Sequence, residues 1–146
     1  SDFFTSTIGV KQGCPLSPTL FGLCIHELEE MVTKFVKEEC VEEVVIGNVD
    51  IMLLLYADDV VLLTNTLGDA QKLMKALEIF CMHTKLSVSC SRTKIMLVKS
   101  QKRDKPCIMY NNGPLECVES FKYFGLEVPS NHIWNDCVAC HLEAGK

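Results

Sequence analysis

The most informative segment of this chain is Leu53-Leu54-Leu55-Tyr56-Ala57-Asp58-Asp59-Val60-Val61-Leu62-Leu63. It places two adjacent carboxylates, Asp58 and Asp59, between two strongly apolar runs. Two like charges side by side repel each other, and neither carboxylate can be buried cheaply without a partner. A tight turn between two strands would lift both side chains to the rim of a sheet. We therefore expect Asp58 and Asp59 at the tip of a β-hairpin.

Such a tip is suited to binding a divalent cation. Mg²⁺ prefers hard oxygen ligands and is commonly held by one or two carboxylates together with substrate phosphates. Two such ions about 3.5–4 Å apart can activate an attacking oxygen and stabilise a leaving one during phosphoryl transfer. The alternative, from spacing alone, is an ordinary Asp-Asp turn with a solvated tip.

Apolar periodicity and turn residues predict the elements around this hairpin. A helix is expected after the loop at residues 11–18, with Ser17 as N-cap and Pro18 in the first turn. A second helix is expected at residues 67–83 with Leu73, Met74, Leu77 and Phe80 inward, and a third at 134–144. Strands are expected at residues 3–10, 44–46, 49–55, 60–64 (buried on both sides), 86–89, 94–98, 107–110, 115–117 and 121–128.

Two dipeptides, Gly47-Asn48 and Asn112-Gly113, are typical of hairpin turns. The order strand, helix, hairpin, helix, strands predicts an α+β fold with helices packed on one face of an antiparallel sheet.

Composition narrows the class of protein. Of the 146 residues, 48% are apolar and 23% charged, which is usual for a globular domain. No apolar run approaches the roughly 20 residues that cross a bilayer, and no signal peptide is visible. We therefore expect an intracellular protein, in the nucleus or cytoplasm, with no membrane partner. The nine cysteines lack regular spacing, so we expect reduced thiols.

Charge is unevenly distributed along the chain, whose net charge is −5. Residues 27–50 carry eight acids against Lys34 and Lys37, whereas residues 92–105 carry six bases against Asp104. Two interpretations stay open: two solvated faces, or a basic edge close to a phosphate backbone.

Four motifs, in this order, resemble the palm of reverse transcriptases from LINE-type (non-LTR) retrotransposons. Residues 9–18 read Gly-Val-Lys-Gln-Gly-Cys-Pro-Leu-Ser-Pro and precede a helix, and Tyr56–Asp59 match the Tyr-Ala-Asp-Asp hairpin of that family. Residues 92–94 match its basic-Thr-Lys segment, and residues 123–125 its Tyr-Leu-Gly-like strand. Together these motifs cover nearly the whole chain.

The resemblance implies a partial reverse transcriptase palm at residues 1–130, without the fingers and the first catalytic strand. Residues 131–146 would begin a truncated thumb helix. The implied activity in the intact parent is RNA-directed DNA polymerisation by two-metal nucleotidyl transfer. The implied cofactor is Mg²⁺ or Mn²⁺, and the implied partners are an RNA template, a DNA primer and deoxynucleoside triphosphates.

The resemblance also implies roles for individual residues. Asp58 would be the principal metal ligand, Asp59 its weaker partner, and Arg92 would stand near the departing pyrophosphate. The remaining residues would contact nucleic acid or nucleotide: Gln12 and Gly13 beneath the templating base and incoming nucleotide, Tyr56 and Ala57 at the primer end, and Tyr123, Phe124 and Gly125 in the primer grip.

Three departures from the family pattern bear on activity. Family members carry another catalytic aspartate on an earlier strand, which would lie upstream of residue 1. Arg92 stands where a lysine usually precedes Thr93, and arginine is a poor acid because its guanidinium group stays protonated in proteins. Phe124 replaces the usual leucine. A second hypothesis is therefore an inactive palm-fold remnant that binds nucleic acid at most weakly.

A third hypothesis rests on Cys137, Cys140 and His141, whose spacing fits haem attachment and, together with His132, suggests zinc. Haem attachment would need export, and zinc would need a fourth ligand at suitable spacing. The resemblance instead assigns this segment to the thumb helix. We therefore expect neither haem nor zinc.

Overall fold

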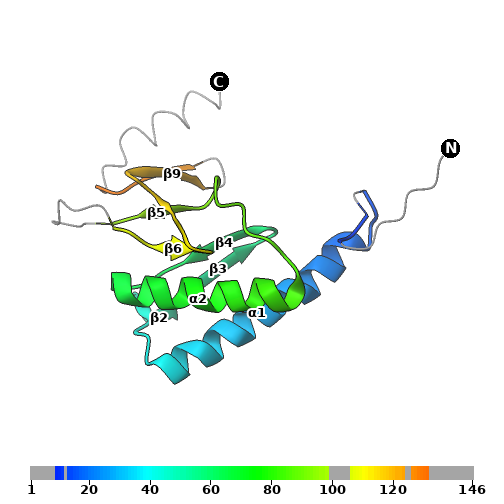
Figure 1. Ribbon diagram of the computed structural model, residues 1–146, viewed down its shortest axis with the longest axis horizontal. Helices are drawn as coiled ribbons and strands as arrows, with labels where there is room; N and C mark the ends of the chain where they lie inside the picture. The colour runs from blue at the N-terminus through cyan, green and yellow to red at the C-terminus, as the bar shows by residue number, and fades with distance from the viewer. Residues whose placement is uncertain (1–8, 12, 99–105, 124–125, 132–146) are drawn as a thin grey trace. The chain divides into compact units, whose positions relative to one another are not determined.

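The computed structural model describes residues 9–11, 13–98, 106–123 and 126–131. The chain divides into two compact units, residues 1–86 and residues 87–146 (Figure 1). In their described parts, the first unit holds two helices and two hairpins, and the second holds short strands. An α+β fold is thus confirmed. No helix among the described residues is long and apolar enough to cross a membrane.

The strands described do not join into the single antiparallel sheet that we expected. They form five two-stranded sheets, of which four are antiparallel and one, β5–β8, is parallel. The bounds in the first unit are α1 Ser17–Glu39, β1 Val44–Ile46, β2 Val49–Ile51, β3 Leu53–Tyr56, β4 Asp59–Leu62 and α2 Leu67–Thr84. Those in the second are β5 Lys94–Met96, β6 Met109–Tyr110, β7 Gly113–Pro114, β8 Glu116–Val118, β9 Ser120–Tyr123 and β10 Leu126–Pro129.

Helix α1 begins one residue earlier than its sequence signal indicated. Its N-cap is Leu16, and no side chain caps the helix. The expectation of Ser17 as N-cap was wrong, because the Ser17 hydroxyl donates instead to the carbonyl oxygen of Lys11 at 2.6 Å. Pro18 does lie in the first turn, as expected. A proline is tolerated there because the N–H groups of the first turn have no partner within the helix. The helix ends at Cys40, whose φ of 50° lies in the left-handed region.

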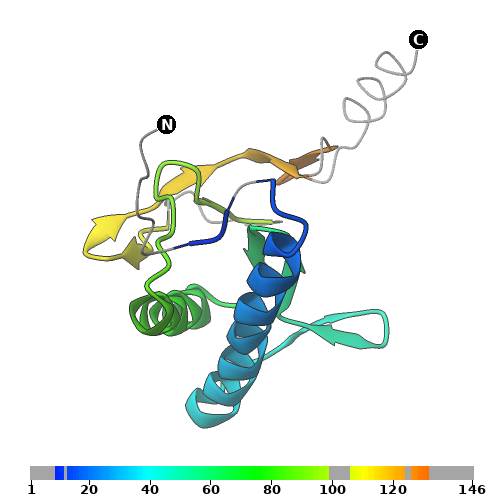
Figure 2. The same ribbon diagram turned by 90° about the vertical axis from the view of Figure 1, so that its right-hand side faces the viewer.

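Helix α2 packs its apolar stripe against α1 (Figure 2). Its N-cap is Thr66, whose side-chain oxygen accepts from the backbone N–H of Asp69 at 3.1 Å. The four residues expected to point inward are buried, together with Ala76 and Cys81. The facing residues of α1 are Leu28, Val32 and Val36. Burying each leucine stabilises the fold by roughly 1.5–3 kcal/mol, an upper estimate.

Two hairpins follow α1 in the first unit. Strands β1 and β2 reverse at Gly47-Asn48, as expected, with Ile46 opposite Val49. The chain breaks pairing at Met52, so the single strand expected at residues 49–55 is two strands. Strands β3 and β4 then pair antiparallel. Residues Val60 to Leu62 are only half-buried, so the expected burial on both sides was wrong, because the two faces of the strand are not both fully covered.

The apolar residues Ile108, Tyr110 and Leu115 of the second unit are buried. The turn between β6 and β7 is Asn111-Asn112, one residue before the expected position, and Gly113 already pairs with Tyr110. Both asparagines have positive φ, 46° and 63°, which this residue type tolerates better than most.

Two expected strands of this unit were wrong. Residues 86–89 form no strand, and a turn follows them directly, because the Ser89 carbonyl accepts from the N–H groups of Arg92 and Thr93 and from the Thr93 hydroxyl. The strand expected at 121–128 is a hairpin, in which Tyr123 pairs with Leu126. Residues 3–8, the helix expected at 134–144 and the Cys137, Cys140 and His141 cluster lie outside the described residues.

Candidate active site

The Asp58 and Asp59 carboxylates lie at the end of the β3–β4 hairpin, as the sequence predicted. Tyr56 and Asp59 form the last strand pair, so Ala57 and Asp58 alone make the connection. All four residues are exposed. The apolar strands position this tip, since Leu53, Leu55 and Val60 to Leu62 are half-buried while the turn is open to solvent.

The backbone at this tip is strained at Ala57. Its φ is 51°, in the left-handed region that alanine adopts at a cost of roughly 1–2 kcal/mol. The connection that joins β1 to β2 has a glycine, Gly47, at the corresponding position, with φ 67°. Residues held in unfavourable backbone conformations cluster at functional sites. The positive φ of Ala57 was not expected from the sequence, although a two-residue hairpin connection usually requires positive φ at its first residue.

The two carboxylates at the tip provide some of the ligands that a hard divalent cation needs. Two adjacent, solvent-open carboxylates offer the oxygen ligands that Mg²⁺ prefers, and leave room for water and substrate phosphates. Within the described ranges, no group of three or more His, Cys, Asp or Glu side chains is arranged to hold a metal ion. Asp58 and Asp59 can therefore supply part of a metal site whose other ligands come from elsewhere.

The other residues singled out by sequence lie in separate places. Gly13 has φ 79° in the turn before α1, and a Cβ there would meet no atom within 4 Å, so the backbone is open to close approach. Arg92 is exposed in the turn after Ser89, and Tyr123 ends β9. Both belong to the second unit, so their roles beside Asp58 stay predictions. Three further predicted site residues lie outside the described part of the chain: Gln12, Phe124 and Gly125.

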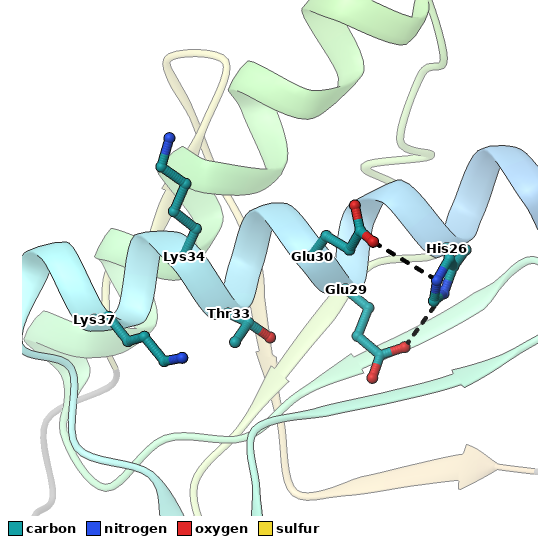
Figure 3. A pocket seen from close by; sticks show the side chains of 6 residues that line it. All are labelled: His26, Glu29, Glu30, Thr33, Lys34 and Lys37. Carbon is teal, nitrogen blue, oxygen red and sulfur yellow. Dashed lines mark ion pairs between the residues drawn. The ribbon is translucent and has the colours of Figure 1, made fainter.

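A shallow depression lies elsewhere in the first unit, along one face of α1 (Figure 3). The residues that line it are His26, Glu29, Glu30, Thr33, Lys34 and Lys37. The His26 ring nitrogens stand 3.7 Å and 3.9 Å from carboxylate oxygens of Glu29 and Glu30, and all three side chains are at least 60% exposed. Exposed pairs of this kind contribute little to stability. The depression is the solvated polar face of one helix and contains neither Asp58 nor Asp59.

Comparisons with known proteins relate this chain to a polymerase family and to a transposon protein. The model of the family described as "Reverse transcriptase (RNA-dependent DNA polymerase)" matches residues 2–128, which include both aspartates. A curated relative from Xenopus laevis, "Transposon TX1 uncharacterized 149 kDa protein", is 29% identical over 96 residues. That alignment covers 66% of this chain and 7% of the relative, so the chain spans a small part of that protein's length. No solved structure matches the chain.

Proposed function

Because the chain belongs to the reverse transcriptase (RNA-dependent DNA polymerase) family, we propose that it is the palm part of an RNA-directed DNA polymerase from a LINE-type element. The family match and the transposon protein from Xenopus laevis together support a reverse transcriptase domain fragment of a retrotransposon. The single observation that carries the proposal is the exposed Asp58-Asp59 pair at a hairpin tip inside the matched residues.

The tip has the chemistry that nucleotidyl transfer needs. Asp58, in the connection itself, faces no strand partner and is the principal ligand; Asp59, at the start of β4, is the second. Bound Mg²⁺ or Mn²⁺ supplies charge stabilisation to the attacking primer hydroxyl and to the departing pyrophosphate. Asp58 and Asp59 would hold the ion together with a further aspartate, which the resemblance places on another strand, and with the phosphates of the nucleotide.

The neighbouring residues position the nucleic acid in this proposal. Tyr56 is 62% exposed beside the tip and borders the primer end, where the small Ala57 leaves room for the sugar. The open backbone at Gly13, with Gln12, lies beneath the templating base and nucleotide. Tyr123, Phe124 and Gly125, around the β9–β10 reversal, form the primer grip. The RNA template, DNA primer and deoxynucleotides meet these residues inside the cell.

The second candidate is a palm remnant without activity, and two observations favour it for residues 1–146 taken alone. The described residues supply two carboxylates at the tip and no third in reach. The chain also has an arginine, Arg92, at the position where the resemblance implies a proton donor, and a guanidinium holds its proton too tightly to donate it. Without the third aspartate, which both metal ions would share as a ligand, the attacking hydroxyl would be misplaced. A displacement of about 1 Å can lower the rate on the order of a hundredfold.

Primer extension separates the two candidates. Residues 1–146 alone should not extend a DNA primer on an RNA template with Mg²⁺ and deoxynucleotides. The extended polymerase, in which these residues follow a strand carrying the third aspartate and precede a thumb domain, should do so. In it Asp58→Asn should lower the rate at least about a hundredfold.

The matched control is Asp50→Asn, which removes an exposed carboxylate from the neighbouring hairpin and should leave the rate unchanged. Extension that survives Asp58→Asn, or that residues 1–146 perform alone, would contradict this assignment of the site.

A further inference from the structure

The β1–β2 hairpin exposes apolar side chains that nothing in the proposed polymerase site uses. Val45 is 63% exposed, Ile46 56% and Val49 59%. Ile46 lies opposite Val49, and Val44 opposite Ile51, so these four β-branched residues share one face of the hairpin. Val45 is on the other face, opposite Asp50. An apolar face of this kind on a projecting element is a candidate contact surface.

Hydrogen bonds hold the base of this hairpin, whereas Ile46 and Val49 beside its turn are exposed. Val41 is buried just before β1, and the Asn65 side-chain amide donates to the Glu43 carbonyl at 3.1 Å. On the other side, the Leu63 N–H donates to the Met52 carbonyl at 2.8 Å. Figure 2 shows the hairpin extending away from α1 and α2. The exposed valines and isoleucine are therefore presented on a rigid base.

The edges of the hairpin are guarded by acidic side chains alone. Among the described residues, β1 and β2 pair only with each other, so each has an open edge. Natural proteins protect such edges with charged side chains, lysine above all, with proline or with a covering segment. Residues 41–52 contain no lysine, arginine or proline, and their charged residues are Glu42, Glu43 and Asp50. An apolar edge of this kind repels an acidic segment but is suited to a basic partner that adds a strand.

Charge decides which partner fits. Glu42 and Asp50 are exposed on the hairpin, and residues 27–50 carry eight acids against two lysines. A nucleic acid, or the same hairpin of a second copy, would bring like charge to this surface, whereas a basic segment is attracted. We propose that the β1–β2 hairpin docks a protein segment that alternates β-branched residues with lysine or arginine.

The test uses residues 1–146 and a blocked octapeptide of alternating valine and lysine, followed by NMR titration of backbone amides. We expect shifts centred on residues 44–51, and affinity that falls as salt rises from 50 to 500 mM because exposed charges are screened. Ile46→Thr with Val49→Thr keeps β-branched side chains and should weaken binding about tenfold. The control Val98→Thr changes a valine that is 51% exposed outside the hairpin and should change nothing.

Three results would overturn the proposal. One is equal binding of an octapeptide that alternates valine with glutamate. Another is a dimer in sedimentation equilibrium that Ile46→Thr with Val49→Thr abolishes, since the occupant would then be a second copy. The third is shifts at residues 44–51 with single-stranded RNA. An unchanged amide spectrum outside residues 42–52 in the double variant establishes that it is folded, so lost peptide binding in it supports the proposal.

Discussion

The β1–β2 and β3–β4 hairpins reverse the chain in the same way with different residues. Each has a two-residue connection whose first residue has positive φ, Gly47 at 67° and Ala57 at 51°. The β1–β2 connection uses glycine, which adopts this conformation without steric conflict. The β3–β4 connection uses alanine and then a carboxylate. The comparison indicates that the β1–β2 turn is suited to its backbone, whereas the β3–β4 turn keeps residues that the backbone disfavours.

Exchanging the two tips should produce the largest effect. Ala57→Gly with Asp58→Asn gives β3–β4 the Gly-Asn connection of β1–β2. In the extended polymerase this change should lower primer extension at least about a hundredfold, because it removes Asp58, the residue proposed as the principal metal ligand. Urea unfolding of residues 1–146 should show no loss of stability in the same variant. An exchanged protein that still extends primers would show that the tip does not carry the chemistry.

Arg92 tests whether the chemistry depends on a residue outside both hairpins. Lysine can donate a proton to the departing pyrophosphate, which arginine cannot do readily. Arg92→Lys in the extended polymerase should therefore raise the single-turnover rate on the order of tenfold. The control is Lys122→Arg, an exposed residue of β9. If Arg92→Lys left the rate unchanged, position 92 would not take part in the reaction, and the β3–β4 tip would remain as the proposed catalytic part of this chain.

Gly47→Ala should destabilise the fold by about 1 kcal/mol, because alanine then meets the left-handed conformation that Ala57 already adopts. The measurement is the urea midpoint of residues 1–146 at constant m-value. Gly22→Ala, within α1, is the matched control and should be neutral or stabilising, because alanine is the better helix former. A stable Gly47→Ala variant would mean that the turn can change its conformation.

Ala57→Gly should have the opposite and smallest effect, a stabilisation of up to about 1 kcal/mol. Relief of the backbone strain at Ala57 is partly offset by the greater conformational freedom of glycine in the unfolded chain. Urea unfolding measures the net difference. A loss of stability would show that the alanine methyl makes contacts that outweigh the strain, which would remove the contrast between the two turns.

The sequence predicted elements well where one pattern dominated. The apolar runs around Asp58 and Asp59 placed the β3–β4 hairpin, and the period of Leu73, Leu77 and Phe80 placed α2. It failed where two local patterns competed. Asn111-Asn112 and Asn112-Gly113 both satisfy a tight turn, and the strand register that selects the first depends on tertiary pairing.

The candidate site shows the same limit. The identity and exposure of Asp58 and Asp59 follow from chemistry that is local in sequence. The left-handed Ala57 depends on the connection having two residues, which the register of Tyr56 with Asp59 fixes. Arg92 and Tyr123 lie in the second unit, and their distance from the tip is set by long-range packing that no local pattern encodes.

Manganese binding to residues 1–146 shows whether Asp58 and Asp59 hold a divalent cation. Mn²⁺ replaces Mg²⁺ at oxygen sites, and its unpaired electrons broaden the NMR signals of nearby amides. We expect weak binding, roughly millimolar, since two carboxylates leave most ligands to water. Broadening should centre on residues 57–59 and disappear in Asp58→Asn but not in Asp50→Asn. Broadening centred on Glu29 and Glu30, or tight binding that Asp58→Asn leaves unchanged, would contradict this expectation.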